Sequence, residues 1–221
     1  MTYAIEARDL YYTYEDGTVA LDHISFRAER GKMTGILGAN GAGKSTLFLN
    51  LNGVLTPAGG EVRVDGVPVT YDRKGLISVR KQVGIVFQDP DDQLFSADVY
   101  RDISFGGVNL GLPEEEVRRR VDEAMEWTGV THLKGKPTHA LSFGQKKRVA
   151  IAGVLVMEPS VVILDEPTAG LDPQGVSDIM RLLAELRGRL GMTIIIATHD
   201  MDIVPLYCDY AYLLNGGKIA A

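Results

Sequence analysis

A stretch of nine residues constrains this chain more than any other feature. It has the pattern Gly-x-x-x-x-Gly-Lys-Ser/Thr and consists of Gly38, Ala39, Asn40, Gly41, Ala42, Gly43, Lys44, Ser45 and Thr46. The apolar residues 33–37 before it predict a strand, and residues 45–49 after it predict the start of a helix. Glycines let main-chain N–H groups approach an anion, and the dipole of the following helix adds to the attraction. The stretch therefore predicts a nucleotide phosphate site, with Lys44 at the β- and γ-phosphates and the Ser45 hydroxyl at Mg²⁺.

The charge and composition of the chain limit the class of protein. The chain has 221 residues and a formal net charge of −6, which argues against a nucleic-acid partner. Neither an apolar stretch of membrane-spanning length nor a signal-peptide pattern at the start is present, so we expect a cytosolic or peripheral protein. The single cysteine, Cys208, excludes an internal disulfide.

Polar side chains follow three apolar runs that read as strands. Residues 83–87 end at Gln88, residues 161–164 end at Asp165 and Glu166, and residues 193–197 are followed by Thr198 and His199. Since the carboxyl ends of parallel strands meet at one edge of a sheet, these side chains predict one shared site. Adjacent buried acids are unfavourable without a cation, which suggests Mg²⁺ for one and water or proton handling for the other. Gln88 could instead cap a loop, and His199 could be a core histidine.

The remaining elements are predicted from local patterns. Residues 4–14 and 20–28 read as two antiparallel strands, residues 61–69 as a hairpin, and residues 75–82 as a short helix. Tyr11, Tyr12 and Tyr14 lie upstream of the phosphate loop, where one ring could stack on adenine or all three could pack a sheet.

From residue 89 to about residue 158 the pattern is mainly helical. A helix after residue 114 should carry the ion pairs Glu115–Arg119 and Glu116–Arg120, and a second helix should run from Ser142 to Glu158. Further on, Asp172 before Pro173 is typical of a helix N-cap. A last hairpin, residues 210–219, should turn at Asn215-Gly216 with type I′ geometry.

Taken in order, these segments resemble the ATP-binding-cassette (ABC) ATPase family over almost the whole chain. Six motifs of the family occur in its order. They are the phosphate loop, Gln88, the signature 141–145, the Walker B run 161–166, the D-loop 169–172 and the switch residue His199. The resemblance implies an α/β fold with a mixed, mainly parallel core sheet, an antiparallel β subdomain and an inserted α-helical subdomain. It implies a single domain, with 1–88 and 159–221 as the ATP-binding core, 89–158 as the helical part, and a C-terminal tail missing from this chain.

The resemblance also implies the reaction and its residues. ATP is hydrolysed to ADP and phosphate, with Glu166 as general base, His199 and Gln88 in catalytic roles, and Ser45, Gln88 and Asp165 at Mg²⁺. Tyr14 is the aromatic residue that stacks on adenine. Ser142 and Gly144 of one subunit complete the nucleotide site of another. Gln145 and Asp172 are also assigned to nucleotide binding, and Asp172 couples the two sites across the interface. Phe143 stands where the family usually has glycine.

The sequences of residues 88–95 and 141–152 are most similar to those of the ATPases of energy-coupling-factor (ECF) importers of the cobalt and nickel type. This implies a peripheral protein on the cytoplasmic face of the cell membrane, paired with itself or a close paralogue and bound to integral membrane subunits. Leu94 and Phe95 are the expected contacts to those subunits. The cargo would be a cobalt or nickel ion, with a vitamin as the alternative.

Rival interpretations belong to other classes. They are a soluble ABC ATPase acting on nucleic acid or ribosomes, an ATPase of another ABC transporter class, a P-loop kinase, and a module that binds ATP without hydrolysing it. A kinase does not need the signature or His199, and a module that only binds ATP would more naturally lack Glu166. The chain shows neither the long coiled-coil insertion nor the second cassette that is usual in the soluble ABC proteins.

Overall fold

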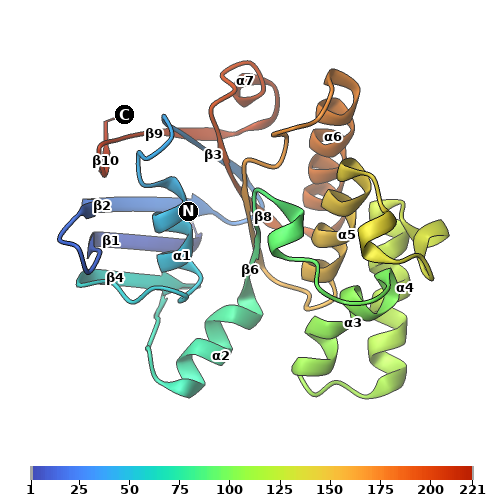
Figure 1. Ribbon diagram of the computed structural model, residues 1–221. Helices are drawn as coiled ribbons and strands as arrows, with labels where there is room; N and C mark the ends of the chain where they lie inside the picture. The colour runs from blue at the N-terminus through green and yellow to red at the C-terminus, as the bar shows by residue number, and fades with distance from the viewer. Residues whose placement is uncertain (1, 221) are drawn as a thin grey trace.

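The computed structural model describes residues 2–220, which form two β-sheets and a set of helices (Figure 1). The core sheet has the strand order β10-β9-β3-β8-β7-β6. Its strands are β3 (Met33–Leu37), β6 (Val83–Val86), β7 (Val161–Asp165), β8 (Thr193–Thr198), β9 (Tyr210–Asn215) and β10 (Lys218–Ile219). All neighbours pair in parallel except β9 and β10, which form an antiparallel hairpin.

The central strands are apolar because both of their faces are covered. In β7, Val161 and Ile163 belong to one hydrophobic core, whereas Val162 and Leu164 belong to the other. A strand buried on both faces needs a continuous apolar run rather than alternation. The parallel arrangement brings the carboxyl ends of β3, β6, β7 and β8 to the same edge, where the phosphate loop begins.

An antiparallel sheet of order β2-β1-β4-β5 lies on one side of the core sheet (Figure 1). It consists of β1 (Tyr3–Thr13), β2 (Val19–Glu29), β4 (Gly59–Val64) and β5 (Val67–Pro68). Helix α1 (Lys44–Leu51) lies between the two sheets, where Leu47, Phe48 and Leu51 are buried. Helix α2 (Arg73–Gln82) follows, and its N-terminus is capped by Asp72.

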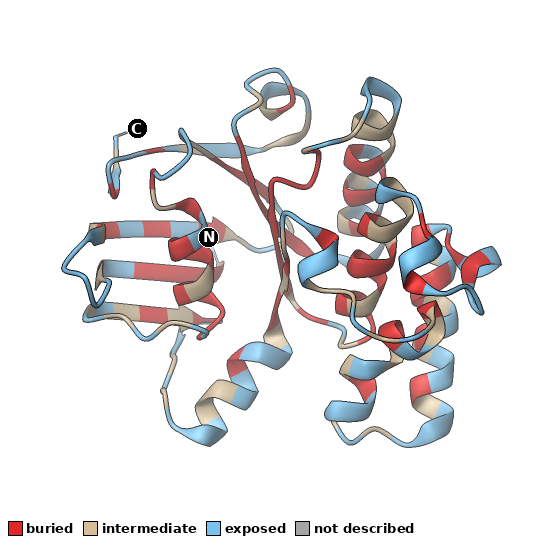
Figure 2. Cartoon of the chain, viewed as in Figure 1, coloured by how far each residue is buried: buried red, intermediate tan, exposed pale blue. Residues whose placement is uncertain are grey.

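The opposite face of the core sheet is covered by α5 (Phe143–Leu155) and α6 (Pro173–Leu190), with α3 (Val99–Asn109) and α4 (Glu114–Thr128) outside them (Figure 1). Short elements complete the chain: η1 (Pro90–Asp92), η2 (Thr131–Leu133), η3 (Thr138–Ala140) and α7 (Val204–Tyr207). Burial is concentrated in the core strands and on the inward faces of α5 and α6, and the outer faces of α2, α3 and α4 are exposed (Figure 2). Within residues 2–220 we find no helix whose length and apolar character suffice to cross a membrane.

The predicted fold class is confirmed: the core sheet is mixed and mainly parallel, a second sheet is antiparallel, and residues 89–158 contain α3, α4 and α5. Two boundaries differ from prediction. The helix expected to reach Glu158 ends at Leu155, since Glu158 has a φ of 50°, outside the helical region. The last hairpin turns at Gly216 and Gly217, both with positive φ as type I′ geometry requires, one residue later than expected.

One predicted ion pair is wrong. Arg119 does not pair with Glu115 but with Glu116, three residues before it, and with Glu123, four residues after it. Both spacings bring side chains together on a helix, so sequence spacing alone does not choose between them. The predicted pair of Arg120 with Glu116 is present, with 2.6 Å between Nε and Oε1.

Candidate active site

The phosphate loop joins β3 to α1. Within the described residues the N-terminus of α1 has no side-chain cap, and its cap residue Gly43 has a φ of 106°. A Cβ on Gly43 would lie 2.6 Å from the Ala20 carbonyl oxygen, so only glycine fits. The ammonium of Lys44 curls back over the loop and donates to the carbonyl oxygens of Gly38 at 2.6 Å and Ala39 at 3.3 Å. Uncapped N–H groups beside a lysine form an anion site.

Two buried acids face this loop from the end of β7. Asp165 and Glu166 are only 7% and 4% exposed. Ser45 Oγ donates to Asp165 Oδ2 at 2.5 Å, and Lys44 Nζ lies 3.4 Å from Glu166 Oε1. Burial raises the pKa of Asp165, and the neighbouring charge of Glu166 adds to that increase, while Ser45 and Lys44 oppose it. A divalent cation at this position would favour the charged form of the carboxylate.

The Glu166 side chain is held from several directions. Its main chain has a φ of 45°, and its N–H donates to the Ala197 carbonyl oxygen at 3.1 Å. Its Oε2 forms a hydrogen bond of 2.9 Å with His199 Nδ1. Its Oε1 is buried and makes no hydrogen bond to any residue in 2–220, although the Lys44 ammonium is near. A buried oxygen in this state fits a site completed by water or ligand.

Lys44, Ser45, Asp165 and Glu166 line one cavity of about 400 Å³, a size suited to a small-molecule ligand. Of the predicted site residues, it is lined by Tyr14, Ala39, Asn40, Gly41, Gly43, Lys44, Ser45, Thr46, Gln88, Asp165 and Glu166. The hydroxyl of Tyr14 shares a hydrogen bond of 2.8 Å with Thr46 Oγ1. Gly38, the first residue of the loop, is not a lining residue, and a Cβ added to it would clash with the Leu214 carbonyl oxygen.

Three lining residues, Thr18, Val19 and Ala20, were not predicted. They belong to the turn and the first residues of β2, directly after Tyr14. Their only signal in the sequence is that proximity, since the residue types carry no phosphate or adenine chemistry.

Ala42 and His199 are not among the lining residues, although His199 is bonded to Glu166. The four predicted residues of the signature and the D-loop also lie outside this cavity. Ser142 accepts from the Gln145 N–H, and the Gln145 side chain accepts from the Ser142 N–H, which forms a capping box at the start of α5. Gly144 is in the first turn of the same helix. Asp172 caps α6 and accepts from the Gly175 N–H at 2.7 Å. Within one chain the structure therefore does not bring the signature and the phosphate loop together.

A second cavity, of about 430 Å³, lies away from the phosphate loop between α2, β6, α3 and α5. Its rim includes Phe95 and Phe105, which are 65% and 46% exposed. Their rings pack edge to face with 4.7 Å between centroids. Leu94, by contrast, is partly buried against the hydrophobic core.

Comparison with known proteins identifies relatives of this geometry. Residues 21–169 match the protein family described as ABC transporter. The chain is 62% identical to the energy-coupling factor transporter ATP-binding protein EcfA2 of Clostridium perfringens, over 98% of this chain and 76% of that protein. It is 57% identical to the energy-coupling factor transporter ATP-binding protein EcfA of Methanocaldococcus jannaschii, over 98% of this chain and 77% of that protein.

Solved structures agree with these matches. The structure of cbiO1 from Clostridium perfringens, described as part of the ABC transporter complex cbiONQ, superposes with a TM-score of 0.93 and 61% identity, covering 100% of this chain and 88% of that one. An ABC transporter cassette in a post-hydrolysis state, dimeric and bound to ADP and phosphate, superposes with a TM-score of 0.88 and 26% identity, covering 98% and 97% of the two chains. The chain belongs to the ABC transporter family, as an ATP-binding subunit that hydrolyses ATP.

Proposed function

We propose that this chain drives the import of a micronutrient, as one of two ATP-hydrolysing cassettes bound to integral membrane subunits on the cytoplasmic face of the cell membrane. The observation that carries the proposal is 62% identity, over 98% of the chain, to an ATP-binding protein of an energy-coupling factor transporter. The arrangement of Lys44, Asp165 and Glu166 around one cavity supports the chemistry.

The residues of the cavity have separate roles in this proposal. Lys44 and the N–H groups of the loop hold the phosphates of ATP. Ser45 and Asp165, whose oxygens are 2.5 Å apart, hold Mg²⁺ together with Gln88, since oxygen donors suit this ion. Bound Mg²⁺ would neutralise negative charge on the phosphate oxygens.

Glu166 is the general base that takes a proton from the attacking water. Its buried Oε1 has no hydrogen-bond partner within the described residues, so this oxygen is free to accept a hydrogen bond from water. The bond of Oε2 to His199 fixes the direction of the carboxylate, which places His199 in an orienting role. Most of the catalysis comes from such positioning and from charge stabilisation.

A second cassette completes the site. Ser142, Gly144, Gln145 and Asp172 lie outside the cavity of their own chain, and Ser142 and Asp172 are exposed. We assign them to the nucleotide bound by the partner, which is a second copy or a close paralogue. The N-terminus of α5, with its helix dipole, suits contact with a γ-phosphate. The dimeric cassette among the structural neighbours supports this assembly.

The cavity between α2, β6, α3 and α5 is the proposed docking site for a membrane subunit. An exposed aromatic pair, Phe95 and Phe105, at its rim offers the apolar contact that such a segment needs. Leu94 is less suited than predicted, because it already packs into the core. We propose no nucleic-acid partner, in line with the net charge of −6. A cobalt or nickel ion is the favoured cargo, and a vitamin is the alternative.

The test is to isolate the membrane subunits that co-purify with the full-length protein and to reconstitute the complex in vesicles. Uptake of Co²⁺, Ni²⁺ and a panel of vitamins is then measured with ATP on the cassette side. We expect ATP-dependent accumulation of Co²⁺ or Ni²⁺ that is lost in a Lys44→Ala complex. Accumulation of a vitamin alone would contradict the metal cargo, and co-purification with nucleic acid rather than membrane proteins would contradict transport.

A further inference from the structure

Lys147 lies in the second turn of α5, outside every residue group assigned above, and only 3% of it is exposed. Its ammonium donates to the main-chain oxygen of Gln88 at 3.1 Å and to that of Glu166 at 3.3 Å. The ring of Phe143 lies over the same ammonium, 5.1 Å from nitrogen to centroid. One buried charge therefore contacts residues that follow β6, that follow β7 and that begin α5.

This arrangement compensates an unfavourable burial. Burial lowers the pKa of Lys147, and the charges of Asp89 and Glu166 oppose that change. An ammonium has three N–H donors and is costly to bury unless they are satisfied. Two carbonyl oxygens and an aromatic face provide the partners here. An apolar side chain of similar length would fill the space without this cost, so packing alone does not explain a lysine at this position.

The contact with Glu166 is made where its backbone is strained. A φ of 45° is unfavourable for a glutamate and persists only when the surroundings hold it. The Glu166 N–H is bonded to Ala197, and its carbonyl oxygen accepts from Ala169 N at 3.1 Å and from Lys147. Lys147 thereby helps to fix the peptide that follows Glu166, and with it the direction of the carboxylate in the cavity.

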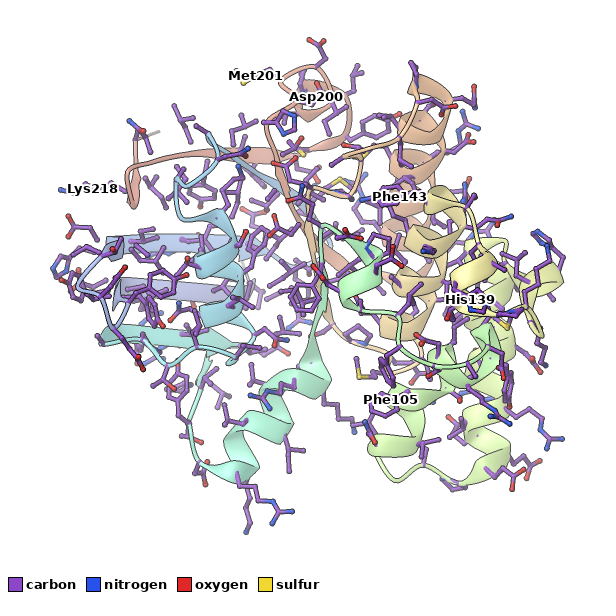
Figure 3. The ribbon with its side chains drawn as sticks, in the orientation of Figure 1. Phe105, His139, Phe143, Asp200, Met201 and Lys218 are labelled. Carbon is purple, nitrogen blue, oxygen red and sulfur yellow. The ribbon has the colours of Figure 1, made fainter. Side chains whose placement is uncertain are left out.

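Phe143 gives this contact a link to the D-loop. The residue lies at the N-terminal end of α5, next to the signature serine (Figure 3). Its ring packs against Gly170, where an added Cβ would come within 2.9 Å of Phe143 Cε1. The departure from the glycine usual at this signature position thus has a structural consequence, because a glycine would leave the Lys147 ammonium without its aromatic cover.

We infer that Lys147 is a positioning residue for ATP hydrolysis, one that holds the main chains of Gln88 and Glu166 in register with the signature helix beneath the ring of Phe143. The inference rests on the proposed role of Glu166 as the base. Lys147 belongs to α5, whereas its acceptors follow strands of the core sheet. A shift of α5 relative to the core sheet would therefore change the orientation of the Glu166 carboxylate.

The test compares Lys147→Met, which removes the charge and the donors, with Lys147→Arg, which keeps both. Steady-state ATP hydrolysis by the full-length protein is measured over a range of ATP concentrations. We expect Lys147→Met to lower kcat by about tenfold or more while KM for ATP changes by less than about threefold, because an orienting contact and not a phosphate contact is lost. Lys147→Arg should have a higher kcat than Lys147→Met, because it keeps the charge and the N–H donors.

Lys146→Met is the matched control. Lys146 is the neighbouring residue on α5. Its ammonium pairs with Asp91 at 2.6 Å and not with the main-chain oxygens of Gln88 and Glu166. We expect its kcat to equal that of the wild type. If Lys147→Met does not fold, as judged by circular dichroism, Phe143→Leu at the exposed end of the contact takes its place, with an expected fall in kcat of about threefold.

A double variant separates an action through Glu166 from a general weakening of the structure. Lys147→Met in a Glu166→Gln background should hydrolyse ATP no more slowly than Glu166→Gln alone. Losses that multiply, or a folded Lys147→Met protein with wild-type kcat, overturn the inference. If Glu166→Gln itself keeps wild-type kcat, the proposed role of Glu166 fails first and the inference falls with it.

Discussion

Glu166 is an acidic side chain that the fold buries away from the water that would normally stabilise it. The carboxylate is almost fully buried, its backbone has a left-handed φ, and one of its oxygens has no hydrogen-bond partner in residues 2–220. Each of these is costly by itself, and such costs gather at functional sites. Here the carboxylate faces the phosphate loop, with Oε1 3.4 Å from the Lys44 ammonium.

The side chain of Tyr14 is held by two contacts. Its ring is packed edge to face against Tyr12, 5.1 Å between centroids, and its hydroxyl is bonded to Thr46, so its position at the cavity is fixed before ligand binds. If it stacks on adenine, Tyr14→Ala should raise KM for ATP by about two- to tenfold, because aromatic stacking contributes about 0.5–1.5 kcal/mol. The measurement is ATP hydrolysis at varied ATP concentration, with kcat expected to change little.

Tyr14→Phe separates the ring from the hydroxyl. It keeps the stacking face and loses only the bond to Thr46, so its KM should stay near the wild-type value. A Tyr14→Ala protein with wild-type KM would show that the ring packs the β-sheet without contacting the base.

Helix α4 carries a cluster of ion pairs around Glu116. Glu116 accepts hydrogen bonds from Arg119 and Arg120, and these lower its pKa from 4.5 to about 2. Arg120 also pairs with Glu158 at 3.0 Å, so the cluster ties α4 to the segment after α5. Because the pKa is lower in the folded state, the stabilisation is complete above pH 4.5 and is lost as the pH falls toward 2.

Glu116→Gln should therefore lower the thermal midpoint at pH 7 by about 1–3 °C, a small change because neither pair is fully buried and solvent screens both. The difference from the wild type should narrow as the pH is lowered from 5 toward 3. Glu115→Gln is the control, since Glu115 forms no ion pair with any other described residue. A difference that stays constant over this pH range would show that Glu116 contributes through packing and not through its charge.

Local signals explain which elements could be predicted from the sequence. Strands such as β7, the Asp172 cap and the phosphate loop are encoded by adjacent residues, and the strand ends placed Gln88, Asp165 and Glu166 at one cavity. The contacts of Lys147 could not be predicted in this way. Its acceptors are 59 and 19 residues away in the chain and are main-chain atoms, which carry no mark in the sequence.

The predicted site residues of the whole molecule lie in two separate places. The phosphate loop and both acids open into one cavity, whereas the signature serine lies at the start of α5 outside it. In the proposed assembly, the signature of a second chain completes the site that the loop of the first chain begins. ATP would then be the contact that joins the two, because it binds the loop of one subunit and the helix N-terminus of the other.

This division predicts an ATP-dependent dimer that accumulates when the proposed base, Glu166, is removed and the bound ATP is not hydrolysed. Glu166→Gln keeps the volume of the side chain and the phosphate contacts, so the protein should accumulate as an ATP-bound dimer on size exclusion with Mg-ATP and remain monomeric with Mg-ADP. The control is Ser142→Arg in the same background. A bulky cation at the exposed signature position should block the contact and return the protein to a monomer, while ATP binding to the phosphate loop is kept. A Glu166→Gln protein that stays monomeric at saturating Mg-ATP would mean that this chain does not share its site in the proposed way.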